Sequence, residues 1–96
     1  MADPIRSIDP TDGRVIASYE RMDDEAISAA VEEADARHRS WRRLPYDTRA
    51  EHLRRVAGSL EDRRDELADL MAAEMGKPLG EGRAEVDKCA WVCRHY

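Results

Sequence analysis

The sequence predicts a mainly α-helical fold with an N-terminal β-hairpin, and three observations lead to this fold class. A dense group of turn-forming residues near the N-terminus separates two short extended stretches. The rest of the chain has apolar residues spaced three and four positions apart, as in amphipathic helices. Leu44-Pro45 and Gly76-Lys77-Pro78 divide that part, because proline does not continue a helix. We therefore expect a hairpin over residues 5–21 and three helices at about 23–43, 45–75 and 79–96.

The composition limits the chain to one small segment, residues 1–96, with few large apolar side chains. Charged residues make up 39% and there is no Phe, so any core is marginal. The net charge of -5 argues against a nucleic-acid or anionic-membrane surface. No apolar run is long enough to span a bilayer and no signal peptide is visible. We expect a cytoplasmic protein with reduced thiols.

The hairpin is predicted from its turn. The run Asp9-Pro10-Thr11-Asp12-Gly13 is rich in turn formers, and its last two residues are a favourable hairpin pair. In the strand that follows, Val15, Ala17 and Tyr19 share one face. An isolated two-stranded hairpin is marginal in water, so we expect it to pack on another surface.

The first helix is expected to begin after Asp23, which can cap it, with Asp24 and Glu25 in the first turn. Its apolar stripe ends at Trp41, before Leu44-Pro45 breaks the pattern. The short connection predicts that this helix packs antiparallel against the next and covers part of it. The stripe consists of Ile27, Ala30, Val31, Ala34, His38 and Trp41.

The second helix is predicted as one rod of about 30 residues, roughly 45 Å long. Gly76 can adopt the left-handed conformation that ends a helix, and Pro78 cannot continue it. Gly58 lowers the helix propensity by about 1 kcal/mol relative to alanine, which a close backbone contact would explain. The stripe of this helix consists of Tyr46, Ala50, Leu53, Ala57, Leu60, Leu67 and Met71.

The third helix has apolar residues on more than one side, which predicts burial from more than one side. Trp91 and Val92 lie off its main face, and the sequence stops at Tyr96 inside the helical pattern. We expect this helix to cover part of the second helix's stripe, and a surface that the chain lacks to cover the rest of that stripe. The main face of the third helix consists of Gly82, Val86, Cys89, Cys93 and Tyr96.

The two cysteines are the first candidates for chemistry. Cys89 and Cys93 lie four apart on a helix, where their side chains point the same way, a poor disulfide geometry. His95 is close in sequence, but no second Cys or His pair has the spacing of a zinc site. No base or glycine-rich turn activates either thiol as a nucleophile. We expect both to be buried, reduced thiols that act as small apolar residues.

The remaining polar candidates also predict structural roles. His38 is expected on the stripe of the first helix and His52 on the outer side of the second. Gly80-Glu81-Gly82 lacks the strand that precedes a phosphate-binding loop. Acidic residues alternate with three arginine pairs and predict a solvated, charge-paired surface. The pairs are Arg42-Arg43, Arg54-Arg55 and Arg63-Arg64. We therefore predict no catalytic, cofactor-binding or metal-binding residue in this chain.

Four motifs occur in order along the chain: the run Ser7–Ala17, Trp41 with Arg49-Ala50 and Leu53, the run Glu74–Leu79, and the helix with Glu85-Val86, Lys88-Cys89 and Arg94-His95-Tyr96. Together, and at this spacing, they resemble the N-terminal part of the NAD(P)-dependent aldehyde dehydrogenases. Two of these sequences look most like the succinate-semialdehyde dehydrogenases: the motif Glu-Met-Gly-Lys-Pro and the run Lys-Cys-Ala-Trp-Val-Cys-Arg. The resemblance covers essentially the whole chain and implies a truncated part of their α/β fold.

The resemblance implies aldehyde oxidation through a cysteine thiohemiacetal, hydride transfer to NAD or NADP, and thioester hydrolysis with a glutamate base. The family's Gly-Gln-Cys and Glu-Leu-Gly-Gly strings do not occur here, so Cys89 and Cys93 are not that nucleophile. The resemblance also implies a homo-oligomer at full length.

Two hypotheses follow. In the first, the chain is an inactive N-terminal fragment whose partner is the missing C-terminal remainder of the enzyme. In the second, it is a self-sufficient helical module that oligomerises or binds a partner through its stripes.

Overall fold

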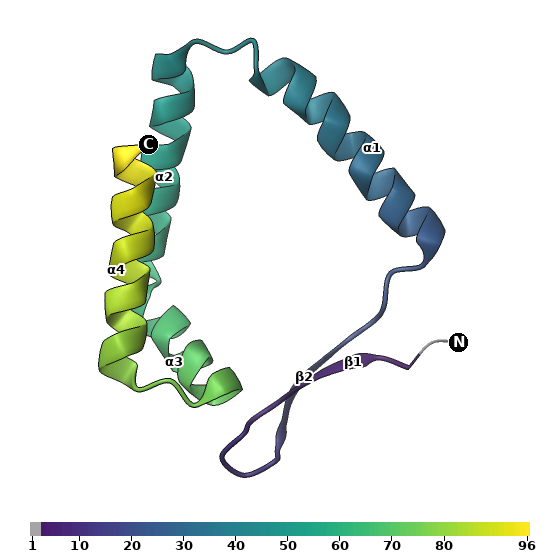
Figure 1. The fold of residues 1–96 in the computed structure, drawn as a ribbon, viewed down its shortest axis with the longest axis vertical. Coiled ribbons are helices and arrows are strands. Elements are labelled where there is room, and N and C mark those ends of the chain that lie inside the picture. The colour runs from purple at the N-terminus through teal and green to yellow at the C-terminus, as the bar shows by residue number, and fades with distance from the viewer. Residues whose placement is uncertain (1–2) are drawn as a thin grey trace.

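The computed structural model describes residues 3–96, which form two strands and four helices. The predicted fold class, mainly α with an N-terminal hairpin, is confirmed, but the number of helices is wrong: there are four where the sequence predicted three (Figure 1). The elements are β1 (Ile5–Ile8), β2 (Val15–Tyr19), α1 (Asp24–Trp41), α2 (Tyr46–Asp62), α3 (Arg64–Met75) and α4 (Leu79–His95).

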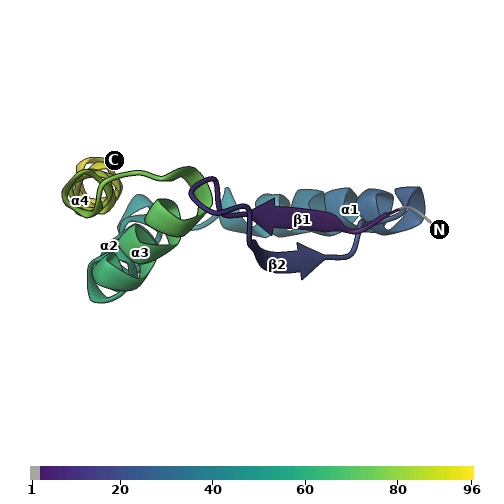
Figure 2. The same ribbon diagram turned by 90° about the horizontal axis from the view of Figure 1, so that it is seen from below.

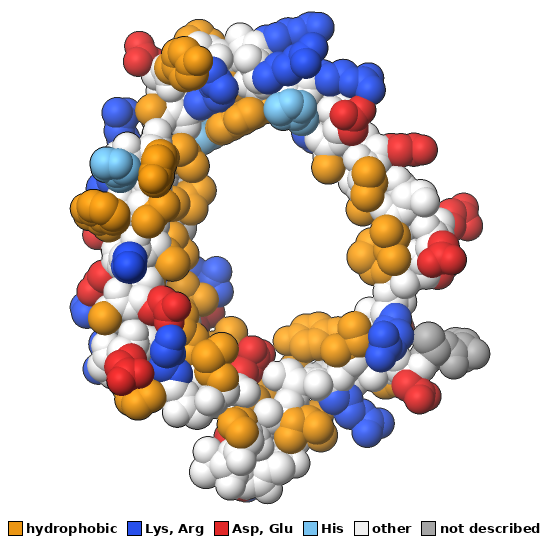
Figure 3. All heavy atoms as spheres, in the orientation of Figure 1, with side chains coloured by type: hydrophobic (Ala, Val, Ile, Leu, Met, Phe, Trp, Pro, Cys, Tyr) orange, Lys and Arg blue, Asp and Glu red, His pale blue; other side chains and the backbone are white. Residues whose placement is uncertain are grey.

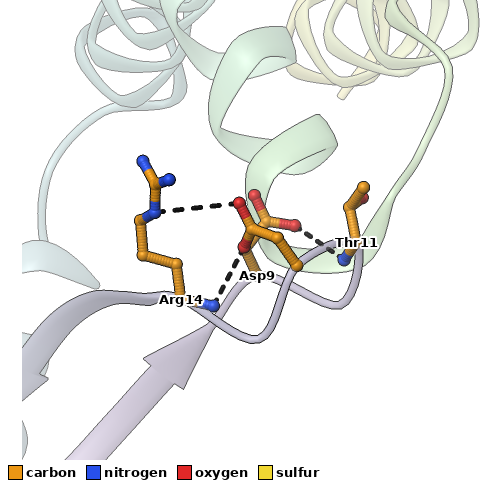
Figure 4. Close-up of polar contacts among 4 residues, drawn as sticks. Asp9, Thr11 and Arg14 are labelled. Atoms are coloured by element: carbon orange, nitrogen blue, oxygen red, sulfur yellow. Dashed lines mark hydrogen bonds and ion pairs between the residues drawn. The ribbon is translucent and has the colours of Figure 1, made fainter.

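The hairpin forms through its turn, as predicted. The strands are antiparallel, with Ile5 opposite Tyr19, and an irregularity follows Ser7. In the turn the carboxylate of Asp9 accepts a hydrogen bond from the backbone N–H of Thr11 at 2.8 Å (Figure 4). Asp12 does the same for Arg14 at 2.9 Å. Gly13 has a φ of 76°, a left-handed conformation that side-chain-bearing residues rarely adopt.

The predicted rod of residues 45–75 is wrong, because the helix breaks at Arg63. Arg63 has φ -99° and ψ 13°, and it ends α2 and begins α3. Its guanidinium donates two hydrogen bonds to the carboxylate of Glu66, at 3.1 and 2.9 Å, across the first turn of α3. The end of α3 is as predicted, since Gly76 is left-handed with φ 71°.

A small core lies where α4 packs antiparallel against α2 and α3 (Figure 1). Ala57 of α2, Ala68 of α3, and Val86 and Ala90 of α4 are buried there. The closest approach is at Gly82, where an added Cβ would lie 3.3 Å from both the Cα and the Cβ of Ala68. The glycine therefore lets two helix backbones meet.

Gly58 has the opposite environment. An added Cβ at Gly58 meets no atom within 4 Å, so a close backbone contact does not explain this glycine.

Helix α1 stands apart, and the molecule is an open, flat ring (Figures 1 and 2). The principal extents are 48 × 40 × 15 Å. None of the residues of α1 is buried, so the prediction that it packs along the second helix is wrong. Its N-terminus is as predicted, because the Asp23 carboxylate accepts a hydrogen bond from the N–H of Ala26 at 2.7 Å. The tip of the hairpin approaches α3, with Pro10 near Gly76.

Among the described residues no helix is both long enough and apolar enough to cross a membrane.

Candidate docking face

The most prominent surface feature is an apolar inner rim around the opening of the ring (Figure 3). Over α1 the hydrophobic side chains lie on the inner rim and charged ones on the outer edge. Ile27 and Val31 are 48% and 64% exposed, although both belong to the apolar stripe. We call the inner rim the docking face. It consists of Ile27, Ala30, Val31 and Ala34 of α1, together with Trp41, Leu53, Val56, Leu60 and Leu67.

The docking face deepens into a groove along α2. The groove has a volume of about 510 Å³ and runs from Trp41, at the end of α1, to Leu67 in α3. The ring of His52 lies 5.3 Å from that of Trp41, tilted by 52°. His52 is therefore half-buried beside Trp41, and its predicted position on the outer side is wrong. A grooved, exposed apolar surface of this kind is typical of a site that binds a protein segment.

His38 is exposed on α1 and lines a shallower depression with Ala34 and Trp41. It lies on the predicted stripe, so the sequence placed it correctly.

Both cysteines lie on α4, and the ring of His95 contacts aromatic side chains. Both thiols are free. Cys93 is half-buried, but Cys89 is exposed, and its predicted burial is wrong. The ring of His95 stacks on Trp91 at 5.3 Å and meets the edge of Tyr96 at 4.8 Å. Within residues 3–96 no group of three or more His, Cys, Asp or Glu side chains is arranged to hold a metal ion.

The arginine pairs are partly neutralised, as the acidic residues around them predicted. Arg64 lies 3.0 Å from a carboxylate oxygen of Asp87, which ties α3 to α4. The hydrogen bonds between Arg63 and Glu66 lower the pKa of the Glu66 carboxyl and raise that of the guanidinium. The hydrogen bond to Glu85 likewise raises the pKa of the Lys77 ammonium. These pairs lie on the surface, and the Arg64–Asp87 pair joins two helices.

The glycines at the start of α4 do not fit the phosphates of a dinucleotide. The cap residue Pro78 lacks an N–H, and the preceding element is the helix α3, where a phosphate loop requires a strand. Gly82 is packed against Ala68, so it cannot contact a ligand. No step of cofactor chemistry is assigned to these residues.

Sequence reasoning missed one polar feature, the environment of Arg49. Its guanidinium carbon lies 4.4 Å from the centre of the Tyr46 ring. Its Nε is shielded from solvent and has no hydrogen-bond acceptor within residues 3–96. A cavity of about 370 Å³ adjoins it, lined also by Trp41 and Tyr96. The i, i+3 spacing of Tyr46 and Arg49 predicts the stacking, but the missing acceptor is visible only in the structure.

Comparison with known proteins decides the family. The aldehyde dehydrogenase family profile matches residues 1–96, the whole chain. The chain belongs to the aldehyde dehydrogenase family. Among its relatives, the Synechocystis protein named probable succinate-semialdehyde dehydrogenase [NADP(+)] is 40% identical over 92 residues. The Escherichia coli protein named succinate semialdehyde dehydrogenase [NAD(P)+] is 38% identical over 90 residues.

A solved structure shows the same fold for this part of an aldehyde dehydrogenase. It is the crystal structure of succinic semialdehyde dehydrogenase from Streptococcus pyogenes in complex with NADP+ as the cofactor. It matches 95% of this chain with a TM-score of 0.86 and 30% sequence identity. The matches to the Synechocystis and Escherichia coli proteins cover 96% and 94% of this chain. In all three comparisons it spans only 20% of the relative's length.

Proposed function

We propose that this chain is the N-terminal scaffold of an NAD(P)-dependent succinate-semialdehyde dehydrogenase. In this role it supports the dinucleotide-binding domain and supplies none of the catalytic residues. The single observation that carries the proposal is the match of the whole chain to one-fifth of enzymes that bear this name. We call the other four-fifths of such an enzyme the remainder. The chain is proposed to be one incomplete segment of the dehydrogenase domain.

The open shape supports this proposal. A compact domain of this length has a radius of gyration of about 12.5 Å, whereas that of this chain is 17.4 Å. Its accessible surface is 7948 Å², about 2,300 Å² more than a compact protein of its mass exposes. An excess of this size is comparable to the area of a large, permanent interface. We propose that the remainder fills the ring and covers the docking face.

The chemistry of the proposed enzyme lies in the remainder. A thiolate must attack the aldehyde carbon to give a thiohemiacetal. Transfer of a hydride to NAD or NADP must then convert it to a thioester, from which water releases the acid. Cys89 is exposed on a solvated helix face, and the one carboxylate that lines the adjoining hollow, that of Glu85, is paired with Lys77. We propose that the full-length protein acts in the cytoplasm as a homo-oligomer.

The reading frame downstream of the Tyr96 codon tests the proposal directly. The expected result is an in-frame continuation that carries Gly-Gln-Cys and Glu-Leu-Gly-Gly strings. The purified 96-residue chain should not reduce NAD or NADP when succinate semialdehyde is added. A stop codon, together with a sharp melting transition and a defined oligomer mass for the chain alone, would instead support a self-sufficient helical module.

A further inference from the structure

The inference concerns Arg49, the half-buried arginine in the first turns of α2. Several arginines of this chain pair with a carboxylate, including Arg55, Arg63 and Arg94. Arg49 forms no ion pair within residues 3–96, although Asp47 lines the same cavity. Its Nε–H is withdrawn from water and has no acceptor. An arginine N–H that is shielded and unpaired is costly, so this arrangement calls for an acceptor from outside the described residues.

The orientation of the guanidinium restricts what that acceptor is. The Tyr46 ring covers one face of the guanidinium at 4.4 Å. Stacking uses the flat face and leaves the N–H groups, which lie in the guanidinium plane, for hydrogen bonds. A carboxylate matches this edge with two parallel bonds and also neutralises the charge.

The position of Tyr96 indicates where the carboxylate comes from. Tyr96 lines the same cavity as Arg49, and its N–H still donates a helical hydrogen bond to the carbonyl of Val92 at 3.0 Å. Since α4 runs antiparallel to α2 and ends short of its first turn (Figure 1), each further helical turn would advance about 5.4 Å toward the start of α2. Residues that continue the helix after position 96 in a full-length protein would therefore lie beside the cavity that Arg49 and Tyr96 line.

We infer that Arg49 is the anchor for a carboxylate carried by the first two helical turns that follow position 96 in the full-length enzyme. This inference rests on the proposed function, because it requires the chain to continue as its relatives do. The resulting ion pair would join the start of α2 to the extended α4 and fix where the remainder leaves the scaffold.

The test extends the chain by the segment of about eight residues, or two turns, that follows the matched region in the Synechocystis relative. Hydrogen–deuterium exchange then compares the protection of residues 46–50 with and without the extension. We expect the extension to raise protection about tenfold, the effect of a hydrogen bond to a charged group. Arg49→Gln should abolish this gain, and so should replacing the acidic residues of the extension by their amides.

Arg54→Gln is the matched control, because Arg54 is exposed on the same helix and has no ion pair within residues 3–96. It should retain the whole gain. Each variant is compared with its own unextended form, so a loss of baseline stability in Arg49→Gln does not affect the result. The inference is overturned if the extension gives no gain, if Arg49→Gln keeps it, if Arg54→Gln also loses it, or if the amide substitutions leave it unchanged. In any of those cases an in-frame continuation that carries the cysteine and glutamate strings would still uphold the proposed function.

Discussion

At Gly82 the backbones of α3 and α4 meet so closely that a methyl group must displace Ala68. Gly82→Ala gains helix propensity but pushes against backbone atoms, and overpacking of this kind costs about 1–3 kcal/mol. After the gain in helix propensity of about 1 kcal/mol is subtracted, we expect a net loss of stability of up to about 2 kcal/mol. Hydrogen–deuterium exchange of the amides in α3 and α4 measures this loss locally.

Gly58→Ala is the matched control, since it adds the same methyl group where nothing lies within 4 Å. It should stabilise the chain by about 0.5–1 kcal/mol. Equal effects at both glycines would contradict the packing described for α3 and α4.

The Arg63–Glu66 pair gives a prediction about pH. Its hydrogen bonds lower the pKa of Glu66 below the ordinary value of 4.5. A carboxyl whose pKa is lower in the folded state stabilises that state above its unfolded pKa. This stability is lost as the pH falls through the lowered folded pKa, so the affected window lies below pH 4.5.

NMR titration of the Glu66 carboxyl should give a midpoint below 4.5. In Arg63→Gln the midpoint should return toward that value, because the charged donor is gone. Arg54→Gln, which removes an exposed arginine from the same helix, should leave it unchanged. An unshifted Glu66 in the native chain would show that the break at Arg63 is not held by this pair.

At the scale of elements, the sequence predicted the hairpin, the Asp23 cap and the Gly76 stop, because each depends on local residues. The sequence also contains a signal for the break at Arg63, which is inconsistent with the predicted rod. The run Glu61-Asp62-Arg63-Arg64-Asp65-Glu66 separates Leu60 from Leu67, and acidic residues at 65 and 66 are typical of a helix start. A single rod would require the 3.6-residue period of apolar residues to continue through this gap, and it does not.

The position of α1 was not predictable from the chain alone. A short connection usually brings neighbouring helices together, but here the apolar stripe of α1 faces the open centre of the ring. The shielded Nε of Arg49 was equally hidden, since it depends on how Tyr46, Trp41 and Tyr96 are brought together.

Val31→Asp tests whether the stripe of α1 binds the remainder. Val31 is 64% exposed, so the helix content of the chain should be unchanged. Burial of an unpaired carboxylate costs several kcal/mol, so binding should weaken at least about tenfold. Co-purification of the tagged chain with the separately expressed remainder of the Synechocystis relative measures the effect.

Ala36→Asp is the control, because Ala36 is exposed on the side of α1 opposite the stripe. It introduces the same charge and should leave co-purification unchanged. If Val31→Asp and Ala36→Asp bind the remainder equally well, the stripe of α1 is not part of the interface.

At the scale of the whole molecule, four small or medium side chains form the buried core of the described residues, while hydrophobic side chains line the opening of the ring (Figure 3). A chain of this length can form a compact domain, but this one buries few large apolar side chains. Its helices follow from local patterns and from the contacts of α4, and their arrangement as a ring suits a surface supplied by the remainder. These properties support the proposed role as a scaffold for the remainder.

The most direct test of this account is an activity measurement on the two parts produced together. The 96-residue chain is co-expressed with the remainder of the Synechocystis relative, and NADPH formation from succinate semialdehyde and NADP is followed. The account predicts that neither part is active alone and that the purified complex is active. Full activity of the remainder without the chain, or NADPH formation by the chain alone, would contradict it.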